Sequence, residues 1–342
     1  MNVGIINATS YFGIDLIRLL VGHPGLHVSA VTARSQAGKT LGAVFPHLHA
    51  SDPAVAALTL TPEIEDSVDL VFSCLPHAVS APALMPFIET GVPVIDVSAD
   101  FRLNDAAEFK RWYDIDHPAP QLLDRAVYGL TEVYRDAISQ AAIVGNPGCY
   151  PTATLLALAP AFKAGIVEPD VIVDAKSGVS GAGRSLKLDS HYSEINESVH
   201  AYGVAGHRHS AEMTQELSEL AGAPVAVNFV PHLIPMTRGI LATCYATLRQ
   251  STTADEITAI YRDFCRDQPF LHYSKSPPRT SWVAGSNHSF LHATLDQTGR
   301  RLVAFGVIDN LVKGAAGQGV QNANLMLGLD ETAGLAVAPL YP

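Results

Sequence analysis

The feature that most constrains this chain is a regular alternation of strand and helix patterns over its first 145 residues. Short runs of β-branched and other apolar residues predict buried strands at residues 1–7, 27–32, 68–73, 92–97 and 141–145. Between them, residues 11–21 and 78–90 carry apolar side chains at helical spacing. Units of roughly 30 residues that run strand, helix, strand are typical of right-handed parallel crossovers. The first part of the chain is therefore predicted to be α/β, with an open doubly wound (Rossmann-like) sheet.

The rest of the chain follows a different pattern, in which strands dominate. A helix is predicted at residues 151–164. Long alternating runs then predict strands at residues 171–176, 226–233, 240–248, 289–293 and 302–308. Such a pattern is typical of a mixed or antiparallel sheet, and hence of an α+β domain. A final helix at about 310–330 is rich in small residues, and we expect it to pack back on the first domain. The predicted domains are residues 1–148, together with that helix, and residues 149–309.

Composition excludes several classes of protein. The chain has 22 Lys and Arg against 33 Asp and Glu, a formal net charge of -11, and no basic cluster that would bind nucleic acid. No apolar stretch approaches the ~18 residues of a membrane span, and the N-terminus shows no basic leader. The four cysteines, Cys74, Cys149, Cys244 and Cys265, lie far apart without CxxC spacing, which argues against a disulfide framework or a zinc site. We therefore expect a soluble, cytoplasmic protein with no nucleic-acid or membrane partner.

The turn between the first strand and the first helix is a candidate dinucleotide site. Such a turn usually carries three glycines, and here only the last of them, Gly13, is present. Asn7 stands at the first glycine position and tolerates left-handed backbone angles, while Thr9 or Ser10 can hydrogen-bond a phosphate. An ordinary turn with a capping Thr or Ser has the same residues, so this segment alone leaves both interpretations open.

The end of the second predicted strand bears on the choice of cofactor. NAD-selective sites place a carboxylate there, whereas NADP-selective sites place a cation. Here the strand ends in Arg34 and Ser35, with no acidic residue before Asp52. If a dinucleotide binds, NADP is favoured; an exposed loop arginine is the alternative.

The stretch GNPGCYPT contains a candidate nucleophile, Cys149. A helix is expected to begin at Tyr150 or Pro151, which places Cys149 at the cap position. Unpaired N–H groups and the helix dipole stabilise a thiolate there. Turn residues flank Cys149, whereas Cys74 lies in an apolar strand, so a nucleophilic role is favoured over an inert one.

A cysteine nucleophile needs a partner that handles protons. The densest histidine group is GHRHSAE, which contains His207, His209 and Glu212. Two histidines at i and i+2 also match a metal-ligand spacing, but a third ligand is not evident, so no metal is predicted. One histidine can face Cys149 while the other holds a substrate anion, and the spacing does not decide between them.

Three other segments are candidates for contact with anions. The glycine-rich stretch 177–184 allows close approach to a ring or an anion, although a flexible surface turn explains it equally well. Arg238 lies in an otherwise apolar run, and Arg102 follows a predicted strand end. Burying an arginine unpaired is costly, so each is a candidate ligand for a carboxylate or phosphate, with a surface ion pair as the alternative.

Together these segments resemble the N-acetyl-gamma-glutamyl-phosphate reductase family, of the longer bacterial type. The resemblance covers nearly the whole chain and rests on VGIINATSYFGIDLIRLL, SCLPHAVS, VIDVSADFRL, YGLTE, GNPGCYPTA, SGVSGAGR, GHRHSAE, PHLIPMTRGI and IDNLVKGAAGQGVQNANLMLG. The cysteine segment, the PMTRG segment and the C-terminal helix are the most specific. One departure is in the first turn, where the family usually has GASGYTG and this chain has Asn7 and Ser10 in place of the first two glycines.

The resemblance implies NADPH-dependent reduction of an acyl phosphate to N-acetylglutamate semialdehyde, with release of phosphate, in arginine biosynthesis. Cys149 matches the family's nucleophile, which forms a thioester, and His207 matches the histidine expected to do acid/base work. His209 and Glu212 are expected to orient His207 or to bind substrate. Arg102 and Arg238 are expected to bind the phosphate and the carboxylate of the substrate. The residues expected at the cofactor are Thr9, Ser10, Tyr11, Phe12, Gly13, Arg34, Ser35, Leu75, Pro76, Ser180, Gly181 and Asn310. The second domain is expected to mediate a homo-oligomer, a dimer or a tetramer.

Other readings compete with this one. A related reductase acts on a carrier-protein-bound glutamyl or aminoadipyl phosphate, but its cysteine is expected to precede Asn-Ala and not the Tyr150-Pro151 found here. Aspartate-semialdehyde dehydrogenase shares the two-domain plan and resembles the chain less in its histidine and PMTRG segments. A cofactor-free Cys/His hydrolase would not need the βαβ start, and a non-catalytic NADP-binding regulator would leave Cys149 without a purpose.

Overall fold

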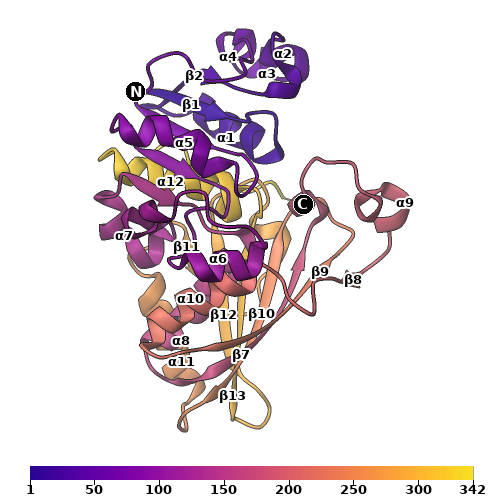
Figure 1. Ribbon diagram of the computed structural model, residues 1–342. Coiled ribbons are helices and arrows are strands. Elements are labelled where there is room, and N and C mark those ends of the chain that lie inside the picture. The colour runs from indigo at the N-terminus through magenta and orange to yellow at the C-terminus, as the bar shows by residue number, and fades with distance from the viewer. Residues whose placement is uncertain (342) are drawn as a thin grey trace. The chain divides into compact units, whose positions relative to one another are not determined.

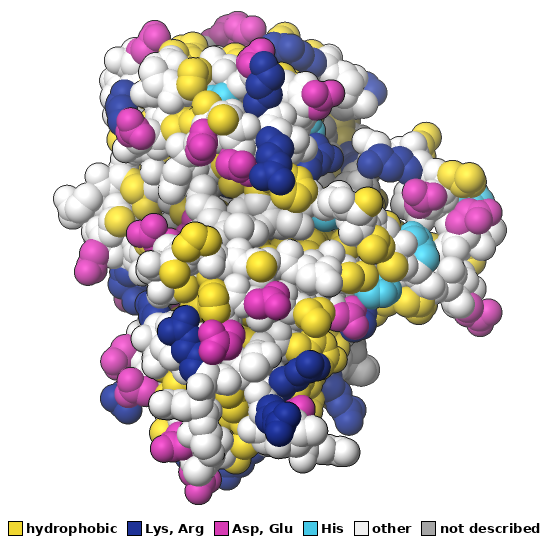
Figure 2. Space-filling model, turned by 60° about the horizontal axis from the view of Figure 1, so that its bottom comes forward, with side chains coloured by type: hydrophobic (Ala, Val, Ile, Leu, Met, Phe, Trp, Pro, Cys, Tyr) yellow, Lys and Arg dark blue, Asp and Glu magenta, His cyan; other side chains and the backbone are white. Residues whose placement is uncertain are grey.

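The structure, a computed structural model, describes residues 1–341. The chain divides into two compact units. The first contains Met1–Pro147 and Ala315–Ala336, and the second contains Gly148–Gly314 and the described residues after Ala336. No helix within residues 1–341 is long and apolar enough to span a membrane. Acidic and basic side chains are interspersed over the face drawn in Figure 2.

The first unit is built on a six-stranded parallel sheet (Figure 1). Its strands are β1 (Asn2–Ile6), β2 (His27–Val31), β3 (Leu70–Ser73), β4 (Val94–Asp96), β5 (Ala126–Tyr128) and β6 (Ile143–Gly145). They pair in the order β2-β1-β3-β4-β6-β5, which reverses between β1 and β3 as in doubly wound α/β folds. The predicted fold class is confirmed. The sequence pattern misses only β5 among these strands, an edge strand of three residues.

Helices and 3₁₀ turns connect these strands. They are α1 (Tyr11–Val21), η1 (Arg34–Gln36), α2 (Leu41–Val44), α3 (Leu48–Ser51), α4 (Pro53–Ala57), α5 (Ser80–Glu89), α6 (Ala106–Tyr113), η2 (Pro120–Arg125) and α7 (Thr131–Ser139). Near the C-terminus a π-helical turn, η6 (Val312–Ala316), leads into α12 (Gly317–Met326).

Helix α1 begins directly against the end of β1. Ser10 caps the helix, because its Oγ accepts the N–H of Gly13 at 2.9 Å. Leu16 and Leu20, on the inner face of the helix, are buried. A Cβ at Gly13 would lie 2.5 Å from the carbonyl oxygen of Ala8, so only glycine permits this packing.

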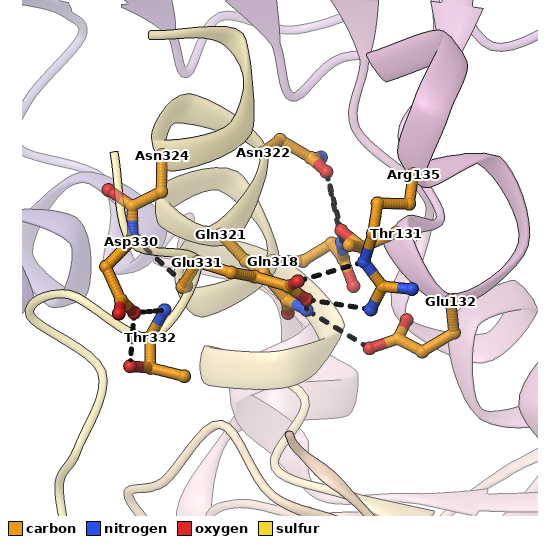
Figure 3. Close-up of polar contacts among 10 residues, drawn as sticks. All are labelled: Thr131, Glu132, Arg135, Gln318, Gln321, Asn322, Asn324, Asp330, Glu331 and Thr332. Atoms are coloured by element: carbon orange, nitrogen blue, oxygen red, sulfur yellow. Dashed lines mark hydrogen bonds and ion pairs between the residues drawn. The ribbon is translucent and has the colours of Figure 1, made fainter. Parts of the chain in front are cut away.

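The C-terminal helix is anchored in the first unit by polar side chains (Figure 3). Asn322 of α12 accepts a hydrogen bond at Oδ1 from Thr131 Oγ1 of α7, at 2.8 Å. Glu331, which follows the helix, pairs with Arg135 of α7, with 2.9 Å between Nε and Oε2. The sequence predicts one continuous helix that packs through small residues, whereas η6 and α12 divide that region and buried amides hold it.

The second unit is built on a seven-stranded mixed sheet in the order β11-β12-β13-β10-β7-β9-β8 (Figure 1). Its strands are β7 (Val167–Ser177), β8 (His200–Ala201), β9 (Ala226–Leu233), β10 (Ile240–Leu248), β11 (Leu271–Tyr273), β12 (Ser289–Leu295) and β13 (Arg301–Ile308). The pairs β7–β9 and β11–β12 are parallel, and the other neighbours are antiparallel. The predicted α+β character is confirmed, and β9 and β10 have the predicted bounds.

Helices α8, α10 and α11 contact this sheet, and they lie together in Figure 1. The helices and short turns of this unit are α8 (Cys149–Lys163), η3 (Val179–Ala182), η4 (Leu188–Ser190), α9 (Tyr192–Ile195), α10 (His209–Ala221), α11 (Ala254–Cys265) and η5 (Thr280–Trp282). On β7, Val171 and Val173 are fully buried, but Ile172 between them is 44% exposed. Because side chains alternate along a strand, one face of the sheet is packed and the opposite face is partly open.

Candidate active site

Cys149 is the first residue of helix α8. The sequence places it at the cap, but the structure gives the cap to Gly148, whose extended backbone precedes the helix and whose carbonyl accepts the N–H of Thr152 at 2.9 Å. The prediction of the helix start is wrong by one or two residues. Cys149 still lies in a first turn of uncharged residues, among N–H groups that have no helical partner.

Cys149 differs from the other three cysteines in exposure. Cys74, Cys244 and Cys265 are buried, whereas Cys149 is partly exposed. Burial raises the pKa of the Cys74 and Cys244 thiols, which keeps both protonated and unreactive. Cys149 is therefore the cysteine that a substrate in solution can reach.

Glu212 holds the turn that precedes the cysteine. Its side chain, on the first turn of α10, is 1% exposed. Oε2 accepts the N–H of Gly148 at 2.9 Å. A Cβ at Gly148 would lie 2.6 Å from His209 Nε2 and 3.0 Å from Glu212 Oε1. The start of α10 thus packs against the turn so closely that a side chain at position 148 would displace His209 or Glu212.

The two predicted histidines lie beside the residue that follows Cys149. The ring centroids of His207 and His209 are each 6.0 Å from that of Tyr150, and they are 4.8 Å from one another. His209 Nε2 lies 3.8 Å from Glu212 Oε1, so the carboxylate that holds the turn also faces this ring. The structure thus brings the cysteine segment, both histidines and Glu212 together in the second unit.

His207 is held as a neutral imidazole with a defined tautomer. Its Nδ1 accepts the N–H of His209 at 3.2 Å, so the proton of the neutral ring is on Nε2. Burial, and next the charge of Arg208, lower the pKa of His207 to about 4. Near pH 7 the ring therefore presents an Nε2–H donor without a positive charge.

Arg238 is fixed by a buried carboxylate that sequence analysis misses. Its NH1 lies 3.5 Å from Oδ1 of Asp309, which is fully buried, while a third of the Arg238 side chain is exposed. Next to it, Asn310 accepts the N–H of Gly239 at 2.8 Å and donates to Ser180 Oγ at 2.9 Å. Three predicted residues, Arg238, Asn310 and Ser180, therefore lie around one turn, and the Arg238 side chain keeps partial access to solvent.

The first unit contains a cavity of about 710 Å³ near the ends of β1 and β2. Its lining includes Arg34, Ser35 and Leu75, which the sequence predicts at the cofactor. It also includes Thr32 and Glu63, from positions that carry no local motif. Glu63 is the acidic residue of this cavity, although it lies beyond the strand end where the sequence argument looks for one.

The first βα turn keeps a left-handed residue and a close strand–helix contact in spite of its missing glycines. Asn7 has φ of 60°, the left-handed conformation that glycine usually supplies, and its Nδ2 donates to the carbonyl of Cys74 at 2.8 Å. Gly13 keeps the close packing, and Ser10 caps the helix. Thr9, Tyr11 and Phe12 belong to the same turn and helix start; Pro76 follows Leu75 at the end of β3. The cavity lining includes Asn7 of this turn, and the size of the cavity suits an adenine nucleotide.

Arg102 lies inside the first unit. It is 8% exposed, and it donates from Nε to the carbonyl of Asn146 at 2.7 Å and from NH2 to that of Val97 at 2.6 Å. These bonds connect the end of β4 with the segment before the cysteine. A part of its predicted anion-binding capacity is therefore committed to the backbone.

Comparison with known proteins places this architecture in a class. Residues 2–141 match the NAD binding domain of semialdehyde dehydrogenase, and residues 149–310 match the semialdehyde dehydrogenase dimerisation domain. Aspartate semialdehyde dehydrogenase II of Vibrio cholerae, complexed with ASA, has a TM-score of 0.71 at 20% identity, over 96% of this chain and 98% of that one. The enzyme of Candida albicans with NADP has a TM-score of 0.70 at 14% identity, over 95% and 98% of the two chains. The chain has the fold of a semialdehyde dehydrogenase and both domains of that class, one of which binds a nicotinamide cofactor.

Closer relatives define the family within this class. N-acetyl-gamma-glutamyl-phosphate reductase of Dehalococcoides mccartyi is 47% identical over 340 residues, which cover 99% of this chain and 98% of that protein. The reductase of Symbiobacterium thermophilum is 48% identical over 347 residues, which cover 100% and 99% of the two proteins. The chain belongs to the N-acetyl-gamma-glutamyl-phosphate reductase family, and it is an oxidoreductase; the predicted family is confirmed.

Proposed function

We propose that this chain reduces N-acetyl-γ-glutamyl phosphate to N-acetylglutamate semialdehyde with NADPH and releases phosphate, as a step of arginine biosynthesis. The observation that carries the proposal is the partly exposed Cys149 at the start of α8, on a turn that Glu212 holds against two histidines. Membership of the reductase family supports the choice of substrate.

Cys149 acts as the nucleophile in this proposal. Its thiolate attacks the γ-acyl carbon, a carbon–sulfur bond forms, and phosphate leaves with the electron pair of the carbon–oxygen bond. The product is a thioester on Cys149. The helix dipole at the first turn of α8 favours the thiolate.

His207, His209 and Glu212 are proposed to exchange the proton, to contact the substrate and to position the site, respectively. NADPH, when bound, supplies the hydride that brings the acyl carbon to the aldehyde level. His207 exchanges a proton at Nε2 with the oxygen on that carbon as the carbon–sulfur bond breaks and the thiolate returns. Glu212 is a positioning residue, since its carboxylate is committed to Gly148 and faces His209. His209 is left to contact the substrate from beside Tyr150.

Two arginines are proposed for the anionic groups of the substrate. Arg238 is the stronger candidate for direct contact, because Asp309 fixes it and a third of its side chain is exposed. Arg102 contributes its positive charge from the interior of the first unit, where two carbonyl oxygens hold it. Phosphate and carboxylate are both suitable partners for a guanidinium.

The cofactor is assigned to the cavity and first turn of the first unit. Arg34 and Ser35 line the cavity, and a cation at this place favours the 2′-phosphate of NADPH over the free ribose of NADH. The helix start at Ser10 suits the pyrophosphate. The proposed cofactor residues are Thr9, Ser10, Tyr11, Phe12, Gly13, Arg34, Ser35, Leu75 and Pro76, with Ser180, Gly181 and Asn310 of the second unit.

We also propose that the chain is a homo-oligomer, a dimer or a tetramer, that works in the cytoplasm. Residues 149–310 match a dimerisation domain, and Ile172 is an exposed apolar side chain on the partly open face of its sheet. None of the four cysteines forms a disulfide within residues 1–341, which suits a reducing compartment.

An acyl-enzyme experiment tests the proposed chemistry. Wild-type protein and Cys149→Ala are mixed with N-acetyl-γ-glutamyl phosphate in the absence of cofactor, and the intact protein and its peptides are examined by mass spectrometry. We expect one acyl group per chain, on Cys149, and none in the variant. Cys265→Ala, which changes a buried cysteine outside the site, is the control and should be acylated like wild type. Phosphate release without an adduct on Cys149 would contradict the proposal.

A further inference from the structure

The loop around His207 contains a tyrosine that neither the reaction nor the sequence motifs explain. Residues 178–206 leave the sheet after β7, and β8 returns them by pairing with β9. Tyr202 follows β8 directly, and its N–H donates to the carbonyl of Pro231 at 3.1 Å. The side chain of Tyr202 is partly buried, whereas that of Tyr192 on the same loop is 75% exposed. The backbone thus fixes Tyr202 at the point where the loop rejoins the core.

The chain then turns closely around the imidazole of His207. Gly203 has φ of 58°, and a Cβ there would lie 3.2 Å from His207 Cδ2 and 3.3 Å from His207 Cβ. The Gly206 N–H donates to the carbonyl of Gly203 at 3.1 Å, which closes the turn. A side chain at position 203 would be both strained and crowded, so the turn approaches the ring as closely as backbone permits.

Aromatic rings from four segments surround His207. The centroids of Tyr202, Phe229 and Tyr150 lie 5.6, 5.3 and 6.0 Å from that of His207, all with edge-to-face geometry. His209 completes the enclosure at 4.8 Å. The titratable or charged neighbours of the ring are thus the hydroxyls of Tyr150 and Tyr202, the second histidine with its Glu212 carboxylate, and Arg208, which is adjacent in the chain.

The proton of the Tyr202 hydroxyl is committed to a hydrogen bond within the protein and not to substrate. It donates to the hydroxyl of Tyr150 at 3.1 Å, and that hydroxyl donates to the carbonyl of His232 at 3.1 Å. Burial raises the pKa of Tyr202 to about 12 and that of Tyr150 further, so both remain protonated donors over the working range of the protein. The hydroxyls form a chain that ends on the backbone, and the ring of Tyr202 is the part that faces His207.

We infer that Tyr202 is a positioning residue for His207, because the ring of Tyr202 closes the aromatic enclosure and limits the access of water to the imidazole. The inference rests on the proposed function only for its consequence in catalysis. An enclosed imidazole stays neutral and keeps Nε2–H available as a donor, since the low polarity of its surroundings disfavours imidazolium. Opening the enclosure admits water, stabilises the imidazolium and raises the pKa of His207 from about 4 toward the ordinary 6.5.

The test is a titration of His207 by NMR in protein with ¹³C-labelled histidine rings, without substrate or cofactor. The signal is assigned by its loss in His207→Gln. In Tyr202→Ala we expect the His207 midpoint to rise by at least one pH unit, and in Tyr202→Phe, which keeps the ring, to stay close to wild type. Tyr192→Ala, an exposed tyrosine on the same loop, is the control and should leave the midpoint unchanged. Tyr202→Val is expected to give a smaller rise and replaces the alanine variant if that variant does not fold.

An unchanged midpoint in folded Tyr202→Ala or Tyr202→Val would overturn the inference. A rise in Tyr202→Phe as large as in Tyr202→Ala would also overturn it, because the hydroxyl and not the ring would then be responsible. If the chain is the proposed reductase, the acid limb of kcat/KM moves upward with the midpoint in Tyr202→Ala. Because the titration needs no turnover, it decides the role of Tyr202 even if the protein fails to reduce the proposed substrate.

Discussion

At Gly148, the absence of a Cβ allows the close packing that sets the geometry of the site. Its φ of −66° is accessible to any residue, so alanine is excluded there by contacts and not by the backbone. The contacts are with His209 Nε2 at 2.6 Å and Glu212 Oε1 at 3.0 Å from the position of a Cβ. Any side chain at position 148 must therefore displace groups that position the nucleophile. The rest of the fold should stay intact.

We predict that Gly148→Ala folds but lowers kcat by about 10- to 100-fold, since a displacement near 1 Å at a reacting group has an effect of this order. Steady-state kinetics and thermal melting together check the prediction. Gly22→Ala is the matched control, because Gly22 has open space around the position of a Cβ and a negative φ. A kcat equal to that of wild type in Gly148→Ala would show that the His209 and Glu212 positions do not matter.

At the scale of elements, strands inside a sheet are predictable, whereas the short edge strands are not. The alternation in β9 and β10 predicts their ends, since each such strand must turn one face to the helices. Strands β5, β8 and β11 have only two or three residues, too few to show a period, and they exist because a neighbouring strand pairs with them. The start of α8 is missed because Gly148 acts as the cap only when Glu212 satisfies its N–H.

The anchoring of α12 also depends on partners that the sequence pattern does not show. Glu331 accepts from Arg135 Nε and NH2 at 2.9 and 3.1 Å, and from Gln321 Nε2 at 2.7 Å (Figure 3). The Arg135 and Glu331 side chains are only 31% and 16% exposed, so water does not fully replace a lost partner. The pair therefore joins α7 to the end of the chain within the first unit.

We predict that Glu331→Ala lowers the free energy of unfolding by about 1–3 kcal/mol, the usual range for a charge-assisted hydrogen bond whose partner is left partly buried. Urea denaturation measures this change. Lys110→Ala serves as the control, because it removes an ion pair with Asp116 in which the side chains are 61% and 84% exposed, and it should have no measurable effect. Equal stabilities for the two variants would refute the anchoring role.

At the scale of the whole molecule, the nucleophile can be predicted from the sequence more readily than the residues that position the site. Cys149 carries a local signal, a cysteine at a helix start among turn residues, so the sequence alone identifies it. Asp309 and Tyr202 carry none, because each acquires a role only through a residue that is distant in the chain. Glu63 likewise lines the cavity only through the fold, because it lies far along the chain from the end of the second strand.

The proposed oligomer also belongs to the scale of the whole molecule, and its interface is expected on the open face of the second sheet. Ile172 is 44% exposed on the face of the sheet where Tyr245 of β10 and Asn228 of β9 are its cross-strand neighbours. We predict that Ile172→Asp shifts the protein toward monomers, because a charge would be buried without a partner in an interface on this face. Light scattering coupled to size exclusion gives the mass. Leu188→Asp, at an exposed position on the loop after β7, is the control; a wild-type mass for Ile172→Asp would place the interface elsewhere.

The most direct test of the central claim is the reaction run in reverse. N-acetylglutamate semialdehyde, phosphate and NADP are mixed with wild type and with Cys149→Ala, and the absorbance of the reduced nicotinamide is followed. We expect NADP reduction that requires phosphate and is lost in the variant, since phosphate must release the acyl group from the Cys149 thioester. Reduction that proceeds without phosphate, or that survives in Cys149→Ala, would contradict covalent acyl-phosphate chemistry at this site.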